Sequence, residues 1–125
     1  MKNIISTDQA PQAIGPYSQA VEANGFLFIS GQIPINPQTG TLLEGGIKEQ
    51  TEQVLLNMSA ILDEAGYSLN DVIKCTCLLD NMDNFKDMNE VYAKFFTSDQ
   101  PARAAYGVVK LPLGVMIEIE AIAAK

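Results

Sequence analysis

The residues best suited to chemistry lie near the C-terminal end of the sequence. Arg103 follows a proline-containing turn at the expected start of a strand, and Glu118 and Glu120 alternate with isoleucines in the segment 116–122. A guanidinium can grip a carboxylate through two parallel hydrogen bonds, and a glutamate can accept a proton from water. The turn 111–114 joins the two expected strands. We therefore expect the cation and the two carboxylates to lie close together and to bind a small acid.

Each of these residues also has a plainer interpretation. Arg103 could be a surface arginine paired with a nearby acid, and the two glutamates could be solvated groups on an exposed strand face. In a cleft, by contrast, mutual repulsion and partial loss of water would raise the pKa of one carboxyl toward neutrality, as a general base requires. The residue pattern leaves both interpretations open.

Four further residues could face the same ligand. Asn89 lies at the edge of the apolar stripe of an expected helix, 85–96, where it is either an inward-facing polar group or an ordinary rim residue. Tyr17 and Ser30 begin and end an expected hairpin and could present hydroxyl groups. Gly31 follows and would let the backbone approach a ligand closely.

The composition argues against several classes of function. The chain has 15 acidic and 8 basic residues, so its net charge of -7 would repel a nucleic acid. With no histidine and two cysteines, Cys75 and Cys77, it has too few ligands for a typical zinc site. A disulfide between such near neighbours would be strained, and we interpret both as small apolar residues in a strand. No phosphate loop or dinucleotide fingerprint is present, so we expect no metal and no cofactor.

No secretory or membrane-spanning segment is apparent in the sequence. The first six residues lack the apolar stretch of a signal peptide, and no stretch approaches the roughly 18 apolar residues of a membrane span. We expect one domain, residues 1–125, located in the cytoplasm with no membrane partner.

Hydrophobic periodicity predicts a mixed α+β domain. Apolar residues recur at helical spacing in 47–65 and 85–96, with Gly66 placed to end the first helix and Asp83 to cap the second. Asn24-Gly25 favours a two-residue hairpin turn. The expected strands are 17–23, 26–30, 72–79, 103–109 and 115–123, and 31–46 is expected to be a loop with short strand pieces at most.

Two helices can cover only one face of the predicted sheet. The other face would expose groups such as Tyr106 and Val108 or their neighbours. An apolar domain usually hides such a face by self-association. We therefore expect a homo-oligomer whose clefts lie between subunits.

The whole sequence resembles the RidA family, also called YjgF, of small enamine and imine deaminases. Several long, ordered matches make the resemblance specific. The segments that carry it are Ala13–Gln19, Ser30–Pro34, Asn89–Tyr92, Pro101–Arg103 and Ile117–Ala121. The resemblance implies a chorismate-mutase-like, two-layer domain with a mixed sheet and two helices on one face. It also implies a homotrimer in which three sheets form a central barrel and three sites lie at subunit interfaces.

The resemblance also implies roles for individual residues. Arg103 would bind the substrate carboxylate, and Glu118 would orient or activate water. Many members have a cysteine where this chain has Ala105, so thiol chemistry at that place is excluded, although the Ala105 amide could still bind the carboxylate. The other positions that match the family pocket are Tyr17, Ser30, Gly31 and Asn89.

The implied activity is that of a 2-iminobutanoate/2-iminopropanoate deaminase. Such an enzyme hydrolyses reactive imines released by pyridoxal-phosphate-dependent dehydratases to 2-oxo acids and ammonia, so its partner is a small 2-imino or 2-oxo acid. The alternative is a non-catalytic carboxylate-binding or regulatory protein that uses the same inter-subunit pocket. Family members have also been linked to RNA cleavage, which the negative net charge and the lack of histidine disfavour here.

Overall fold

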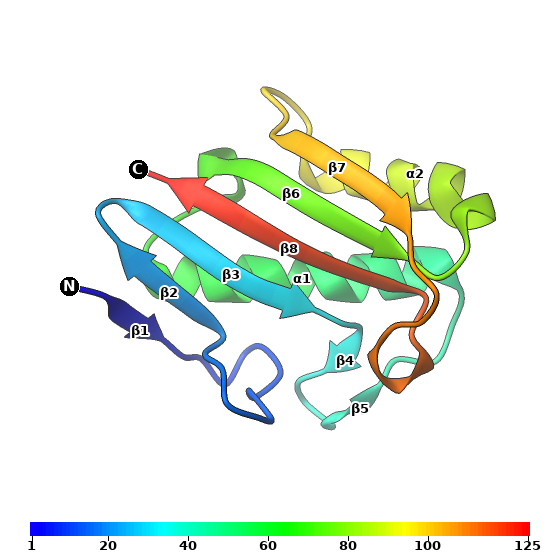
Figure 1. Ribbon diagram of the computed structural model, residues 1–125, viewed down its shortest axis with the longest axis horizontal. Coiled ribbons are helices and arrows are strands. Elements are labelled where there is room, and N and C mark those ends of the chain that lie inside the picture. Colours follow the sequence, from blue (N-terminus) through cyan, green and yellow to red (C-terminus); the bar gives the residue numbers. More distant parts are fainter.

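A six-stranded sheet forms one layer of the molecule, and two helices packed on one face form the other (Figure 1). The computed structural model describes the whole chain, residues 1–125. The strand order is β1-β2-β3-β8-β6-β7, and only the neighbours β6 and β7 are parallel. The predicted α+β class is confirmed. The strands are β1 (Asn3–Ile5), β2 (Ala20–Ala23), β3 (Phe26–Gln32), β6 (Val72–Leu79), β7 (Ala102–Gly107) and β8 (Ile117–Ala124), with a separate small sheet of β4 (Ile35–Asn36) and β5 (Thr41–Leu42).

The two helices, α1 (Ile47–Ala65) and α2 (Phe85–Phe95), begin and end within one residue of the prediction. Gly66 ends α1 with a φ of 81°, so the predicted left-handed C-terminus is confirmed. Among the helices, none combines the length and the apolar character that a bilayer crossing requires. Three short 3-10 turns complete the elements: Leu69–Asp71, Met82–Asn84 and Pro112–Gly114.

The prediction that Asp83 caps α2 is wrong. Asp83 lies inside the 3-10 turn that precedes the helix, and its own N–H donates to Oδ1 of Asn81 at 2.9 Å. Asn84, the residue directly before α2, makes no capping hydrogen bond with its side chain. The extra turn therefore moves the side-chain cap from the helix to the turn, where Asn81 provides it.

The predicted hairpin is confirmed as β2 and β3. Asn24 and Gly25 have φ values of 52° and 78°, as a two-residue turn with both central residues in the left-handed region requires. The first strand begins at Ala20 rather than Tyr17, and the second runs on to Gln32. Tyr17 therefore belongs to the loop before the sheet, not to a strand.

Alternation along the strands decides which side chains lie under the helices. One row of paired residues crosses the sheet from β1 to β7, and its first five members are buried against the helices. Arg103 is the sixth member of that row, so its side chain leaves β7 on the helix-covered face. The full row is Ile5, Ala20, Ile29, Ala121, Cys75 and Arg103.

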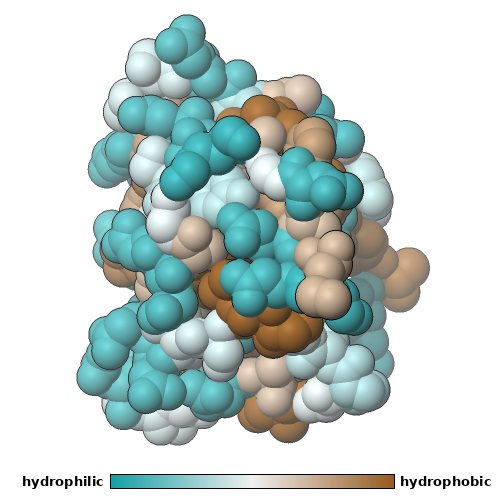
Figure 2. Space-filling model, turned by 90° about the vertical axis from the view of Figure 1, so that its left-hand side faces the viewer, coloured by the Kyte–Doolittle hydropathy of each residue, from teal (hydrophilic) through white to brown (hydrophobic).

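The opposite face of the sheet has no helix on it. Here Glu118 of β8 pairs with Leu78 of β6, which in turn pairs with Tyr106 of β7. Tyr106 is exposed as predicted, but Val108 lies beyond the end of β7. Large apolar side chains are also exposed on β1 and β3, toward the other edge of the sheet: Ile4 (52%), Phe26 (42%) and Phe28 (48%). Figure 2, which views the end where both termini lie, shows apolar atoms at the surface among hydrophilic residues.

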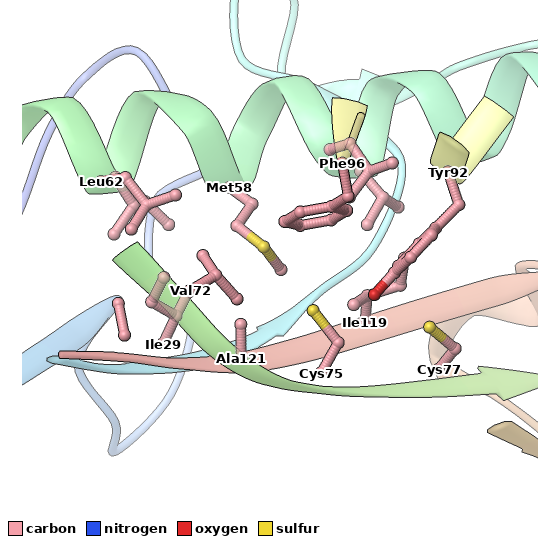
Figure 3. Packing of buried hydrophobic residues seen from close by; sticks show 14 of the residues in the cluster. Ile29, Met58, Leu62, Val72, Cys75, Cys77, Tyr92, Phe96, Ile119 and Ala121 are labelled. Carbon is pink, nitrogen blue, oxygen red and sulfur yellow. The ribbon is translucent and has the colours of Figure 1, made fainter. Parts of the chain in front are cut away.

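The core lies between the sheet and the two helices. Met58 and Leu62 of α1 and Phe96 at the end of α2 point toward β-strand residues such as Ala121 and Cys75 (Figure 3). Cys75 and Cys77 are fully buried free thiols, which confirms their interpretation as small apolar residues. Burial raises the pKa of both thiols, that of Cys77 to about 12.

The two thiols are therefore expected to be unreactive in the folded protein. Because the thiolate is the reactive form, 5,5'-dithiobis(2-nitrobenzoate) at pH 8 should label neither Cys75 nor Cys77 until a denaturant unfolds the chain. Absorbance at 412 nm with and without guanidinium chloride measures this. Rapid labelling of one thiol in the native protein would show that the layer formed by α2 opens readily.

Candidate functional site

Glu118 faces a cleft of about 690 Å³ at the end of β3 on the open face of the sheet. Ser30 and Gly31 come from β3, Tyr17 comes from the preceding loop, and the turn around Leu113 closes another side. The structure thus brings together four of the predicted site residues: Tyr17, Ser30, Gly31 and Glu118.

The wall that holds Tyr17 is organised by Gln19, which is 3% exposed. Its Nε2 donates to the carbonyl oxygens of Thr7 and Pro11, and its Oε1 accepts from the N–H of Thr7 at 2.7 Å. These bonds tie the loop before β2 to the start of the chain. Sequence reasoning did not single out Gln19, because its partners are backbone groups that no residue pattern reveals.

The Ser30 hydroxyl is already engaged. It donates to the carbonyl oxygen of Ser18 at 2.6 Å, so only its lone pairs remain for a ligand. The bond also fixes the loop that carries Tyr17 against β3. Ser30 therefore contributes to the shape of the cleft as well as to its polarity.

Gly31 makes room for the Glu118 carboxylate. A Cβ built on Gly31 would overlap Oε2 of Glu118 and lie 2.8 Å from its Cδ. Glu118 is half-buried at this place, and burial, together with the negative charge of Glu120, raises the pKa of its carboxyl above the usual value. A raised carboxyl pKa in a cleft is what the general-base interpretation of Glu118 requires.

Arg103 lies in a different environment, against α2. Its Nη1 donates to Oδ1 of Asn89 at 2.7 Å, and its Cζ lies 4.9 Å from the ring centre of Tyr92 and 5.4 Å from that of Phe85. A hollow of about 430 Å³ adjoins it, lined in part by Gln100. Within the chain Arg103 forms no ion pair, because the only salt bridge of the structure joins Lys48 and Glu90.

Arg103 and Glu118 do not meet within one chain, which corrects the expectation drawn from the turn that joins their strands. Although β7 and β8 follow one another in sequence, β6 lies between them in the sheet. Moreover, Arg103 is in the helix-covered row while Glu118 is on the open face. Ala105 pairs with buried Cys77 and so lies on the Arg103 side. The predicted site residues form two separate groups.

Comparison with known proteins supports the family resemblance. The family described as Endoribonuclease L-PSP matches residues 7–125. A RutC family protein of Pyrococcus horikoshii is 60% identical over 125 residues, covering 100% of this chain and 99% of that protein. The 2-iminobutanoate/2-iminopropanoate deaminase of Mus musculus is 48% identical over 123 residues, covering 98% and 91%.

Solved structures agree with this assignment. A candidate endoribonuclease of Thermotoga maritima superposes with a TM-score of 0.98 at 54% identity, covering 100% of this chain and 98% of that one. E. coli TdcF with bound serine superposes with a TM-score of 0.94 at 42% identity, covering 98% of each chain. The fold of the chain is therefore that of these proteins.

The contact between Gly31 and Glu118 can be tested without an activity assay. Gly31→Ala should push the carboxylate out of its half-buried position, so the pKa of Glu118 should fall toward the ordinary glutamate value. Carbon-13 NMR titration of the glutamate carboxyl groups measures the pKa. The matched control is Gly46→Ala, since a Cβ there meets its nearest atom at 3.7 Å and neither glycine has a positive φ. An unchanged Glu118 pKa in Gly31→Ala would contradict the close contact.

Proposed function

Because the chain belongs to the RidA/YjgF family, we propose that it hydrolyses short 2-imino acids, such as 2-iminopropanoate and 2-iminobutanoate, to 2-oxo acids and ammonia. One observation carries the proposal: a half-buried glutamate with a raised pKa beside a glycine in an open cleft. The imines would come from pyridoxal-phosphate-dependent dehydratases acting on serine and threonine. We place this activity in the cytoplasm.

The reaction needs one base and one anchor. Arg103 binds the substrate carboxylate through the N–H groups that it does not donate to Asn89. Glu118 accepts a proton from water as the water oxygen attacks C2, and the C=N double bond becomes a C–N single bond. Glu118 returns this proton to nitrogen, which gives a carbinolamine. The hydroxyl proton of that intermediate is then transferred to nitrogen, the C–N bond breaks, ammonia leaves, and the oxygen forms the carbonyl of the 2-oxo acid. Tyr17 and the backbone at Ser30-Gly31 steady the nitrogen end.

The catalytic demand is small, because imines already hydrolyse in water. A thousandfold acceleration corresponds to only about 4 kcal/mol of transition-state stabilisation. Holding a water molecule beside one base of suitable pKa can supply that much. The reaction as written consumes only water and requires no cofactor.

A complete site needs two copies of the chain. We infer a homotrimer in which Glu118 of one protomer and Arg103 of the next face the same substrate, with the three sheets arranged as a central barrel. The opposite orientation of the two side chains within a protomer supports this inference. So does the exposed apolar surface around Phe26 and Phe28, because association removes such surface from water.

A non-catalytic carboxylate-binding or regulatory protein is the alternative. The observation that favours it is that Arg103 has its own hollow, which could hold an acid without Glu118. The relative crystallised with serine also holds a small molecule that bears a carboxylate. Saturable binding of 2-oxo acids without imine turnover would support this alternative.

The activity can be tested in an assay coupled to a threonine dehydratase. Addition of the protein should reduce the imine trapped by semicarbazide, and Arg103→Ala should raise KM at least tenfold because it removes a charge-assisted contact. Glu118→Gln should lower kcat more than it changes KM. If the trapped imine does not fall when the unmodified protein is added, the chain is not a deaminase.

The shared site can be tested by mixing these two impaired variants. If one protomer supplies Arg103 and another supplies Glu118, random co-assembly of Arg103→Ala and Glu118→Gln chains should restore about one quarter of the sites. The mixture is made by joint unfolding and refolding, and each variant refolded alone is the control. A mixture no more active than the separate variants would mean that each site is built from one chain.

The pH dependence of kcat/KM should report the ionisation of the Glu118 carboxyl. Activity should rise as Glu118 loses its proton, with a midpoint above the ordinary value of 4.5. Glu120→Gln should move the midpoint down, because it removes a repelling charge, and Glu118→Gln should abolish the rise in activity with pH. If Glu120→Gln leaves the pH midpoint of kcat/KM unchanged, the charge of Glu120 does not act on the Glu118 carboxyl.

The same pKa shift affects stability. Because the folded state holds the Glu118 proton more tightly than the unfolded chain does, ionisation of Glu118 lowers the free energy of unfolding as pH rises above 4.5.

A further inference from the structure

The contacts of Arg103 suggest a role for three residues of α2. Asn89, Phe85 and Tyr92 all contact the Arg103 guanidinium, and all three are uncharged. They lie on one side of the helix, since Phe85, Asn89 and Tyr92 are four and three residues apart. We call these three residues the neutral bracket.

We propose that the neutral bracket holds Arg103 in the orientation that binds a carboxylate, without neutralising its charge, and that Asn89 acts through Arg103 rather than on the substrate. The inference rests on the proposed function only in naming a 2-imino or 2-oxo acid as the ligand. In this proposal Asn89, Phe85 and Tyr92 are positioning residues, whereas Arg103 touches the substrate.

A hydrogen bond to Asn89 orients the Arg103 side chain. An exposed arginine side chain samples many rotamers, and fixing it costs conformational entropy that would weaken ligand binding. The 2.7 Å bond from Nη1 to Oδ1 of Asn89 limits this motion before the ligand arrives. It uses one N–H of the five on the guanidinium, so the remaining donors stay free for a carboxylate.

Two aromatic rings also hold the Arg103 guanidinium. The guanidinium lies within 5.4 Å of both ring centres, where the negative faces of aromatic rings attract a cation. The Tyr92 ring is itself held by the core: it is 6% exposed and lies 4.7 Å from the ring centre of Phe96. Figure 3 shows Tyr92 reaching down from α2 toward the cysteines of β6. One side of the bracket is therefore a rigid part of the protein interior.

No acidic side chain of the chain is paired with Arg103. The chain carries 15 acidic residues, yet the group that accepts a hydrogen bond from Arg103 is an amide. The neighbouring residue Glu90, which is exposed, forms a salt bridge of 2.8 Å with Lys48. A carboxylate in the place of Asn89 would compete with the carboxylate of a ligand for the same fork. The amide avoids that competition while keeping the orienting bond.

The deciding variant is Asn89→Asp, which keeps the shape of the side chain and adds the competing charge. It should raise the dissociation constant of 2-oxobutanoate, measured by titration calorimetry, at least tenfold. KM in the imine assay should rise by a similar factor while kcat changes by less than about threefold. Asn89→Ala, which removes the orienting bond but adds no charge, should weaken binding less than Asn89→Asp does.

Two matched controls separate positioning from a general effect on α2. Asn84→Asp makes the same chemical change at the start of the same helix, and Phe95→Leu makes the same change as Phe85→Leu at another half-buried ring. Phe85→Leu should weaken binding of 2-oxobutanoate severalfold, whereas neither control should. Thermal unfolding of every variant checks that the fold is retained.

The outcomes are distinguishable from those for the proposed function. Weaker 2-oxobutanoate binding by Asn89→Asp without imine turnover in any variant would support the neutral bracket and refute the deaminase activity. Binding by Asn89→Asp as tight as by the unmodified protein would overturn the proposal. So would equal loss in Asn89→Ala and Asn89→Asp, since the added negative charge would then have no effect of its own. Failure of the unmodified protein to bind 2-oxobutanoate would also overturn it.

Discussion

Successive side chains of a strand point to opposite faces of its sheet, and this rule determines where Arg103 and Glu118 lie. Two helices cover one face, so the central strands β3, β6 and β8 each have a buried side and a side open to solvent or to another subunit. Arg103 leaves β7 on the helix-covered side, and Glu118 leaves β8 on the open side. A shift of one residue in β8 would turn Glu118 toward the helices and expose the buried residues of that strand. The burial of the core therefore fixes the separation of the two charges.

The same separation gives each charged group a distinct electrostatic environment. Glu118 is half-buried beside Gly31 and close to Glu120, so its carboxyl holds its proton more firmly than an exposed glutamate does. Arg103 lies against aromatic rings and an amide, with no acid bound to it. Within a single chain neither charge compensates the other. Both remain available for a ligand that carries a carboxylate at one end and reacts with water at the other, provided that two protomers bring the groups together.

The loops that shape the cleft depend on buried polar side chains. Gln19 bonds the backbone of the first residues to the loop of Tyr17, and Ser30 bonds the backbone of Ser18. Asn57 of α1 holds the segment after β3, because its Nδ2 donates to the carbonyl oxygens of Ile33 and Ile35. These bonds satisfy backbone groups that irregular segments would otherwise leave unpaired. The cleft is therefore rigidly connected to both layers of the fold.

The sequence by itself determined the local elements and the identity of the reactive residues. Helix 47–65, strand 72–79 and the Asn24-Gly25 turn depend on periodicity and on backbone preferences of nearby residues, and they agree with the structure. Only the tertiary structure decided that β6 lies between β7 and β8, because a parallel pairing between distant segments leaves no mark in the spacing of residues. The partners of Arg103 were likewise decided by the packing of α2 against the edge of the sheet. Chemistry can be recognised from residue types, but which groups share a compartment depends on long-range strand order.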